Sequence, residues 1–139
     1  MERRTVLGMT AGAVVTGLAG CAGGSARPDR DHDVGMTTRR FRPAELTVDA
    51  GETVVWANTS SHAHTVTAYD EGLPSGADYF ASGGYDSEDE AREAWRSGFG
   101  GRIDPGDTYE HVFDVSGEYP YVCIPHEASG MTGTVVVES

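Results

Sequence analysis

The sequence predicts an all-β protein, a Greek-key β-sandwich with one short helix in an insertion. Short runs of β-branched and aromatic residues recur along the chain and are separated by turns rich in glycine, proline and aspartate. Several short strands with regular turns are typical of a two-sheet sandwich. The 139 residues suffice for one domain with a real hydrophobic core but are too few for two.

The first 20 residues are predicted to be a signal peptide of the twin-arginine, lipoprotein type. Arg3 and Arg4 precede an apolar run, residues 6–19, which is too short to span a bilayer comfortably. The run ends in Leu-Ala-Gly before Cys21, a pattern that resembles a site of cleavage and lipid attachment. A plain secretory peptide with a chance cysteine is the alternative. We therefore expect export, and a lipid anchor at Cys21 on the outer face of the cytoplasmic membrane.

Residues 21–33 contain glycine, serine, proline, arginine and aspartate with almost nothing apolar, which predicts a flexible tether. The folded domain is expected over residues 34–139. Trp56, in an apolar run typical of a sandwich interior, is expected in the core. The predicted strands cover residues 46–48, 53–57, 64–68, 108–115, 119–123 and 132–138.

One good helix is predicted within the long polar insertion that follows residue 70. Ser87 and Glu90 have the spacing of a capping box at its start. Ala91 and Trp95 are four residues apart, so they share a face that should pack on the sandwich. Gly98 is a natural stop for the helix. We interpret this helix as structural rather than chemical.

The charge of the chain excludes one class of partner. The formal net charge is −12, with 22 acidic residues against ten basic ones, and all ten basic residues are arginine. Nucleic-acid binding is not expected, because phosphate would be repelled. We interpret the acidity as adaptation to high salt, where screening makes self-repulsion tolerable. An ordinary acidic protein with a basic partner is the alternative.

A short loop near the C-terminus carries the chemistry. Cys123, His126 and Met131 follow the spacing C-x2-H-x4-M between two predicted strands. A thiolate, an imidazole and a thioether together favour copper over zinc or calcium, and blue-copper sites add a second histidine. The alternative is a buried free cysteine, a surface histidine and a core methionine. If Cys21 is lipidated, Cys123 has no disulfide partner, and metal ligation would account for it.

The second histidine must come from elsewhere in the chain. His32 belongs to the predicted tether, and His111 is in the middle of a predicted strand, where an ordinary strand role is more common. His62 lies in a serine-rich loop, whereas His64 lies where that loop becomes a strand. The residues themselves leave these two in competition.

Residues 41–137 resemble the plastocyanin-like cupredoxins, and most closely the halocyanin subgroup of halophilic archaea. The family's first histidine is followed by a polar residue and an aliphatic strand residue, which selects His64. The resemblance implies one copper ion held by His64, Cys123, His126 and Met131. It also implies a monomer that shuttles single electrons between membrane electron-transport complexes. The motifs that carry it are Val-Val-Trp-Ala-Asn, His-Thr-Val, Pro-Gly-Asp-Thr-Tyr and Gly-Glu-Tyr-Pro-Tyr-Val-Cys-Ile-Pro-His-Glu-Ala-Ser-Gly-Met-Thr-Gly.

The chain departs from the family pattern at two positions near the ligands. Thr65 stands where the family often has asparagine, so its amide could still reach the Cys123 sulfur while a side-chain link between the ligand loops would differ. Val122 stands where plant plastocyanins have a tyrosine before the cysteine, so electrons are expected to leave through the edge of His126. Pro125 lacks an N–H, and we expect it to leave the sulfur with the Thr65 amide as its one amide partner.

Three other functions are compatible with parts of this sequence. A copper delivery or storage lipoprotein is the alternative, although such proteins generally use methionine-rich or paired-cysteine sites. A copper enzyme would need further histidine clusters, which the sequence lacks, so we expect no enzymatic activity. A structural lipoprotein with a buried Cys123 is the last possibility.

Overall fold

The computed structural model describes residues 32–139. The predicted signal peptide, Cys21 and nearly all of the predicted tether lie outside the described residues. Among the residues described, no helix has the length and apolar character needed to cross a membrane.

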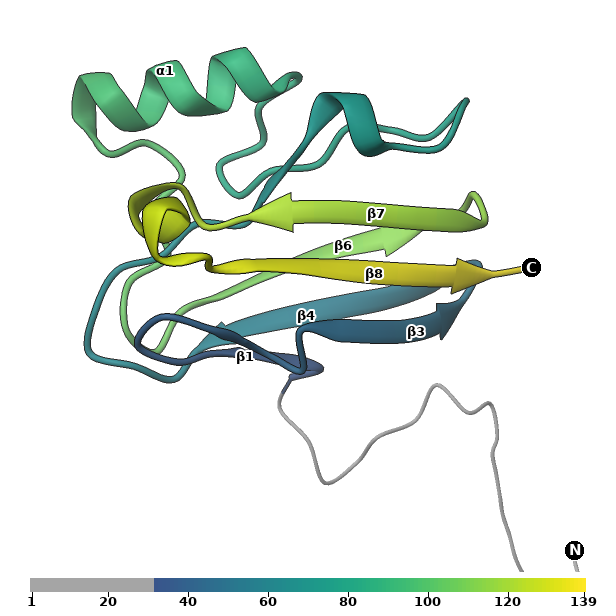
Figure 1. Cartoon of the computed structure of the whole chain (residues 1–139), viewed down its shortest axis with the longest axis horizontal. Coiled ribbons are helices and arrows are strands. Elements are labelled where there is room, and N and C mark those ends of the chain that lie inside the picture. The colour runs from purple at the N-terminus through teal and green to yellow at the C-terminus, as the bar shows by residue number, and fades with distance from the viewer. Residues whose placement is uncertain (1–31) are drawn as a thin grey trace, which may run out of the picture. The chain divides into compact units, whose positions relative to one another are not determined.

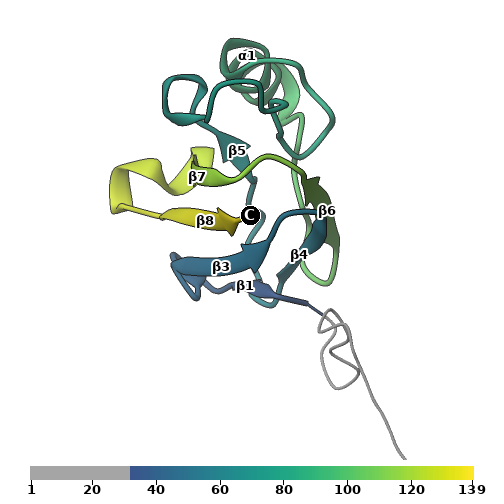
Figure 2. The same ribbon diagram turned by 90° about the vertical axis from the view of Figure 1, so that its right-hand side faces the viewer.

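Two four-stranded sheets pack face to face and confirm the predicted all-β sandwich (Figures 1 and 2). The view along the strands separates the layers, with β5, β7, β8 and β3 in one and β6, β4 and β1 in the other (Figure 2). The first sheet has the order β2 (Phe41–Arg42), β1 (Val34–Met36), β4 (Glu52–Asn58) and β6 (Thr108–Phe113). The second has the order β3 (Glu45–Asp49), β8 (Thr132–Glu138), β7 (Gly117–Val122) and β5 (Thr67–Ala68).

Most strand pairs are antiparallel, but two parallel pairs complete the sandwich. β1 runs parallel to β4, and β3 runs parallel to β8 along its whole length. β4 pairs with β6, and β7 pairs with both β8 and β5, in antiparallel registers. β5 belongs to the second sheet and β6 to the first, so the chain crosses from one sheet to the other between them. The insertion makes this crossing.

The core centres on Trp56, as the sequence predicts. Its side chain is fully buried on β4 and contacts four aromatic rings from both sheets and the insertion. The ring centroids lie 5.5 to 6.2 Å away, on Phe80, Tyr109, Phe113 and Tyr121. Offset and edge-on pairs of this kind stabilise an interior beyond the area they bury.

The predicted strand over residues 64–68 is largely wrong. β5 contains only Thr67 and Ala68, and His64 lies outside it in an isolated bridge. The His64 amide donates to the Ile103 carbonyl at 3.1 Å, and the Ile103 amide donates back at 2.7 Å. Because this partner comes from the end of the insertion and not from a neighbouring strand, the pairing cannot propagate as a ladder. β1 and β2 were not predicted, since two or three residues are too few for a clear alternation.

The helix α1 (Glu88–Gly98) forms where it is expected, but its ends differ from the prediction. Ser87 Oγ accepts from the Glu90 amide at 3.1 Å, whereas the Glu90 carboxylate bonds the amide of Asp86 instead of Ser87. Half of the predicted capping box is therefore present. Gly98 is still helical, and Phe99 ends the helix in a left-handed conformation with φ 61°.

The two apolar residues predicted to face the sandwich differ in burial. Ala91 is buried where α1 lies over β5, at the top of Figure 2. Trp95 is half-buried and packs against the exposed Phe99, with ring centroids 5.0 Å apart. This ring contact accompanies the left-handed Phe99, where a glycine would be usual.

Candidate metal centre

Two loops at one end of the sandwich bring the predicted ligands together. His64 comes from the loop before β5. The other three come from the connection between β7 and β8, in which Cys123 follows β7 and Met131 precedes β8. The connection closes on itself, because the Cys123 amide donates to the Met131 carbonyl at 3.0 Å and the Met131 amide donates to the His126 carbonyl at 3.2 Å. Its short 3-10 helix, η3 (Ile124–Ser129), is the yellow coil at the end of the sheets in Figure 1.

Three strong donor atoms converge where the two loops meet. Cys123 Sγ lies 3.5 Å from His64 Nδ1 and 3.5 Å from His126 Nδ1, and all three atoms lie within 4.8 Å of one another. With bonds of about 2.0 Å to imidazole and about 2.3 Å to thiolate, as found for zinc, that nitrogen–sulfur separation subtends roughly 110° at a shared ion. One small metal ion therefore fits between the three side chains.

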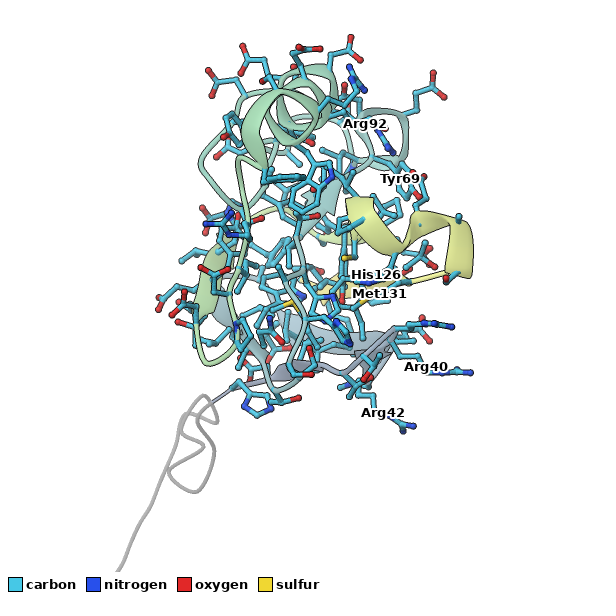
Figure 3. All side chains as sticks on the ribbon, turned by 90° about the vertical axis from the view of Figure 1, so that its left-hand side faces the viewer. Arg40, Arg42, Tyr69, Arg92, His126 and Met131 are labelled. Atoms are coloured by element: carbon cyan, nitrogen blue, oxygen red, sulfur yellow. The ribbon has the colours of Figure 1, made fainter. Side chains whose placement is uncertain are left out.

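Met131 completes the soft character of the site. Its side chain is fully buried and belongs to the hydrophobic core. Figure 3 places Met131 beside His126, in agreement with the hydrogen bond that joins their backbones. Two imidazoles, one thiolate and a neighbouring thioether are the donor set of blue-copper centres.

The surroundings disfavour charge on the ligands until a cation is present. Burial, and then the neighbouring His126 and His62, lower the pKa of His64 to about 4. Burial raises the pKa of the Cys123 thiol to about 11, against the effect of nearby amides. Neutral imidazoles are ready to bind a metal, whereas the thiolate needs the positive charge of an ion to compensate it. The pocket is thus suited to a bound cation.

His64 is fixed by a hydroxyl that the sequence analysis did not single out. Ser60 Oγ lies 2.9 Å from His64 Nε2 and 2.8 Å from Asn58 Oδ1. With Nδ1 facing the sulfur and bound to a metal ion, Nε2 would carry the proton and donate it to Ser60. Asn58 in turn donates to the Ile103 carbonyl at 2.9 Å, next to the His64 bridge. A partner on the second ring nitrogen sets the tautomer and orientation of a metal-binding histidine.

The structure separates the two competing histidines. His62 is not part of the three-residue cluster, and its ring centroid is 6.5 Å from that of His126. His111 is also outside the cluster and stacks on Phe80, with ring centroids 5.0 Å apart, as expected of an ordinary strand residue.

Thr65 links the two ligand loops twice. Its amide donates to Cys123 Sγ at 3.4 Å, as expected. Its Oγ1 accepts from the Ile124 amide at 2.9 Å, so the side-chain link between the loops is made by a hydroxyl. The amide of His126 also lowers the pKa of the Cys123 thiol, but its hydrogen bond goes to the Cys123 carbonyl at 3.1 Å. Pro125 lies exposed between these two engaged amides.

The ligands differ in their access to solvent. His64, Cys123 and Met131 are completely buried, whereas His126 is partly exposed. Val122, at the position before the cysteine, is also completely buried. Of these residues, only His126 offers an edge to a molecule arriving from solution.

Known proteins have similar sequences and a similar fold. Residues 30–138 match the family described as copper binding proteins, plastocyanin/azurin family. Plastocyanin of Scenedesmus fuscus is 34% identical over 98 residues, which cover 70% of this chain and 86% of that protein. Chloroplastic plastocyanin of Tetradesmus obliquus is also 34% identical, although the match spans only 58% of its length. The crystal structure of amicyanin from Paracoccus versutus is 27% identical, with a TM-score of 0.52 over 81% of this chain and 85% of amicyanin.

Proposed function

Because the chain belongs to the plastocyanin/azurin family of copper-binding proteins, we propose that it is a blue, type 1 copper protein that carries single electrons. The observation that carries the proposal is the set of three donor atoms within 4.8 Å of one another, formed by two imidazoles and a buried thiol. His64, Cys123 and His126 would be the strong ligands, and Met131 the weak axial one. When bound, copper supplies the one-electron change between Cu(I) and Cu(II).

The role of the protein is to hold these ligands still during that change. Ser60 fixes the ring of His64, and Thr65 ties its own loop to the Cys123 sulfur and to Ile124. Burial keeps water away from the thiolate. A donor set that lies between the preferences of Cu(I) and Cu(II), and cannot relax toward either, needs little rearrangement, which favours fast electron transfer.

Electrons would enter and leave through His126. Its ring is the one ligand with a partly exposed edge, and the buried Val122 offers no aromatic route beside the cysteine. The exposed residues of η3 and its end are Pro125, Ala128, Ser129 and Gly130, none of which is charged, and the neighbouring Glu127 carboxylate is already paired with Arg92. A redox partner can therefore approach the ring closely.

We further propose the setting in which this carrier works. The Leu-Ala-Gly-Cys pattern and the twin arginines support export and attachment to the outer face of the cytoplasmic membrane through a lipid on Cys21. Membrane electron-transport complexes are then the donor and acceptor. The net charge of −12 and the absence of lysine support a protein of the halocyanin type that works in high salt.

Spectroscopy of the copper-loaded protein tests the proposal. The Cu(II) form should show an intense visible band from thiolate-to-copper charge transfer and a narrow copper hyperfine splitting in electron paramagnetic resonance. Voltammetry should give a reversible one-electron wave. A colourless protein with ordinary copper resonance would overturn the blue-copper assignment. Colour without a reversible wave would support copper delivery or storage instead.

A further inference from the structure

Three arginines stand apart in this acidic domain. The arginines of residues 32–139 are Arg39, Arg40, Arg42, Arg92, Arg96 and Arg102. The last three are paired with Glu88 and Glu127, with Glu93 and with Asp104, respectively. The first three, which we call the arginine patch, are exposed, and none forms an ion pair with another described residue. On a chain with a large excess of carboxylates, three neighbouring arginines that form no ion pair with a described residue call for a functional explanation.

The arginine patch lies beside the metal centre. Arg39 and Arg40 occupy the turn between β1 and β2, which closes when the Thr37 amide donates to the Arg40 carbonyl at 2.9 Å. The end of β1 is tied to the loop that leads to His64, because the Thr59 amide donates to the Met36 carbonyl at 3.1 Å. Figure 1 places the turn that follows β1 at the same end of the sheets as η3, and Figure 3 shows Arg40 and Arg42 projecting outward.

We propose that the arginine patch docks the acidic surface of a redox partner and holds that partner against the exposed edge of His126. This inference rests on the proposed electron-transfer function. The exposed residues of η3 carry no charge, and the carboxylate of Glu127 is already paired with Arg92, so this surface can make close contact but offers little to orient a partner. Charges at the rim of such a contact steer the encounter and fix its register more than they add affinity.

The net charge of the chain makes this local patch necessary. At −12, the molecule as a whole repels an acidic partner. In high salt the screening distance falls to about 3 Å at 1 M, so distant carboxylates no longer act while charges in direct contact still do. Arginine suits this task because its planar guanidinium can bind carboxylates with two parallel hydrogen bonds.

Anionic lipid headgroups would also attract arginines, but the position of the arginine patch favours a protein. It lies at the end of the molecule where His126 is exposed, and a headgroup cannot accept the electron that leaves there. A membrane bound to this face would cover His126. A partner with a redox centre beneath an acidic surface would instead use both features at once.

The test compares two variants that lose the same charge. Arg39→Gln/Arg40→Gln changes the arginine patch, and Arg96→Gln/Arg102→Gln removes two arginines that are already paired elsewhere. The reduced copper protein is oxidised by hexacyanoferrate(III), an anionic probe, in a stopped-flow experiment. An ionic strength of about 0.1 M limits the reach of each charge to roughly 10 Å. We expect the patch variant to react about tenfold more slowly and the control within about twofold of the wild type. Equal slowing of both variants would show a net-charge effect only and overturn the proposal.

A cationic oxidant separates this proposal from the function on which it rests. Tris(phenanthroline)cobalt(III) should oxidise the wild type, and the patch variant at an equal or higher rate. If neither probe oxidises the copper-loaded wild type, electron transfer itself is wrong. If both probes oxidise the wild type, and the patch variant reacts at the wild-type rate with each, only the proposed docking surface is wrong. The visible spectrum and melting temperature of both variants must match those of the wild type.

Vesicles of equal parts phosphatidylcholine and phosphatidylglycerol test the lipid alternative. The full chain is used with Cys21→Ser as a common background, so that no attached lipid contributes. We expect the arginine patch to make no difference to sedimentation with these vesicles. Vesicle binding that is lost in Arg39→Gln/Arg40→Gln, combined with an unchanged rate with hexacyanoferrate(III), would assign the patch to lipid and overturn the proposal.

Discussion

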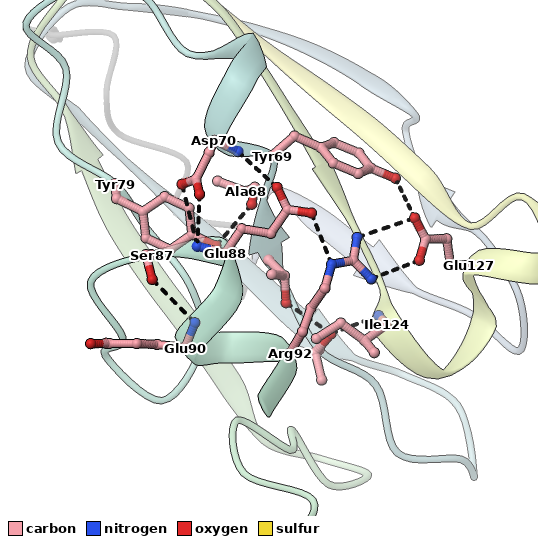
Figure 4. A network of polar contacts seen from close by, with 12 residues as sticks. Ala68, Tyr69, Asp70, Tyr79, Ser87, Glu88, Glu90, Arg92, Ile124 and Glu127 are labelled. Carbon is pink, nitrogen blue, oxygen red and sulfur yellow. Dashed lines mark hydrogen bonds and ion pairs between the residues drawn. The ribbon is translucent and has the colours of Figure 1, made fainter. Parts of the chain in front are cut away.

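Glu127, the residue after the predicted ligand His126, forms a bidentate ion pair with Arg92 of α1. The guanidinium donates to both carboxylate oxygens, at 2.8 and 3.2 Å, and a third bond of 2.8 Å joins it to Glu88 (Figure 4). Tyr69, next to β5, donates to the same carboxylate at 3.0 Å. The insertion helix thus reaches across to the loop that carries three of the four predicted ligands, and its structural role is to hold that loop.

Replacing Arg92 should therefore destabilise the protein more than replacing an ordinary surface arginine. Both partners are partly exposed, so solvent screening keeps the loss for Arg92→Met near 1 kcal/mol in the free energy of unfolding. Arg96→Met is the matched control, because Arg96 pairs with Glu93 on an exposed helix face and should contribute close to zero. Urea unfolding of the metal-free protein measures both. Equal losses would mean that the Arg92–Glu127 pair contributes no more than a surface ion pair.

Substitution of the sulfur ligands should separate their roles. Cys123→Ser should abolish the visible charge-transfer band, because the band requires a thiolate on Cu(II). Met131→Leu should keep the colour and shift the reduction potential, since the axial bond is weak. Absorption spectra and voltammetry of the copper-loaded variants measure these effects. A blue Cys123→Ser protein would contradict the assignment.

The choice between the two competing histidines can be tested in the same way. His64→Ala should destroy the blue site, whereas His62→Ala should leave it intact, because only His64 Nδ1 faces the sulfur. His62→Ala is a control for the loss of a nearby imidazole. Bleaching by His62→Ala alone would reverse the assignment.

The sequence predicts the sandwich and the ligands well because each leaves a local signal. Alternating residues mark β3 and β6, a short apolar run marks β4, and the spacing of Cys123, His126 and Met131 is contained in one loop. His64 lies 59 positions before Cys123 and could be selected over His62 only through a family resemblance, since the residues alone do not specify which ring points at the sulfur.

The parts that could not be predicted depend on contacts between distant segments. The role of Ser60 could be predicted only if it were known that Nε2 of His64 faces its hydroxyl. The ion pair between Arg92 and Glu127 joins residues 35 positions apart. Arg92 has one local signal, its i,i+4 relation to Glu88, and that relation indicates only an ordinary helix pair. The arginine patch is visible in the sequence, but its position beside the metal centre is not.

Lowering the salt concentration should destabilise the fold. The net charge of −12 leaves carboxylates repelling one another, and the screening distance grows from about 3 Å at 1 M salt to about 10 Å at 0.1 M. The melting temperature of the copper-loaded protein should therefore fall as sodium chloride is removed. A melting temperature that stays flat or rises would contradict the proposed adaptation to high salt.

His111 should make stability depend on pH. Its ring is packed between Phe80 and Phe113, and burial lowers its pKa, although the carboxylates of Asp78 and Asp114 oppose the shift. Below pH about 6.5 the unfolded chain binds a proton that the folded state resists, so the free energy of unfolding falls as the pH is lowered and is unaffected above that range.

The variant His111→Gln should show a smaller loss of stability between about pH 7 and 5. The difference in slope cannot exceed about 1.4 kcal/mol per pH unit for one proton. Both proteins are compared in the copper-loaded state, so that the metal-binding histidines contribute equally. Identical slopes would show that burial does not shift the pKa of His111.

Pro125 should keep the reduction potential lower than another residue would. The amides on either side are engaged, Ile124 with Thr65 Oγ1 and His126 with the Cys123 carbonyl, and a residue other than proline at position 125 would add one more N–H to this turn, two residues from the Cys123 sulfur. Such a donor would stabilise negative charge on the sulfur and weaken its donation to Cu(II), which favours the reduced form. Proline has no N–H to donate. Voltammetry of Pro125→Ala, with its blue spectrum intact, should show a higher potential. An unchanged or lower potential in a still-blue protein would restrict Pro125 to stiffening the loop.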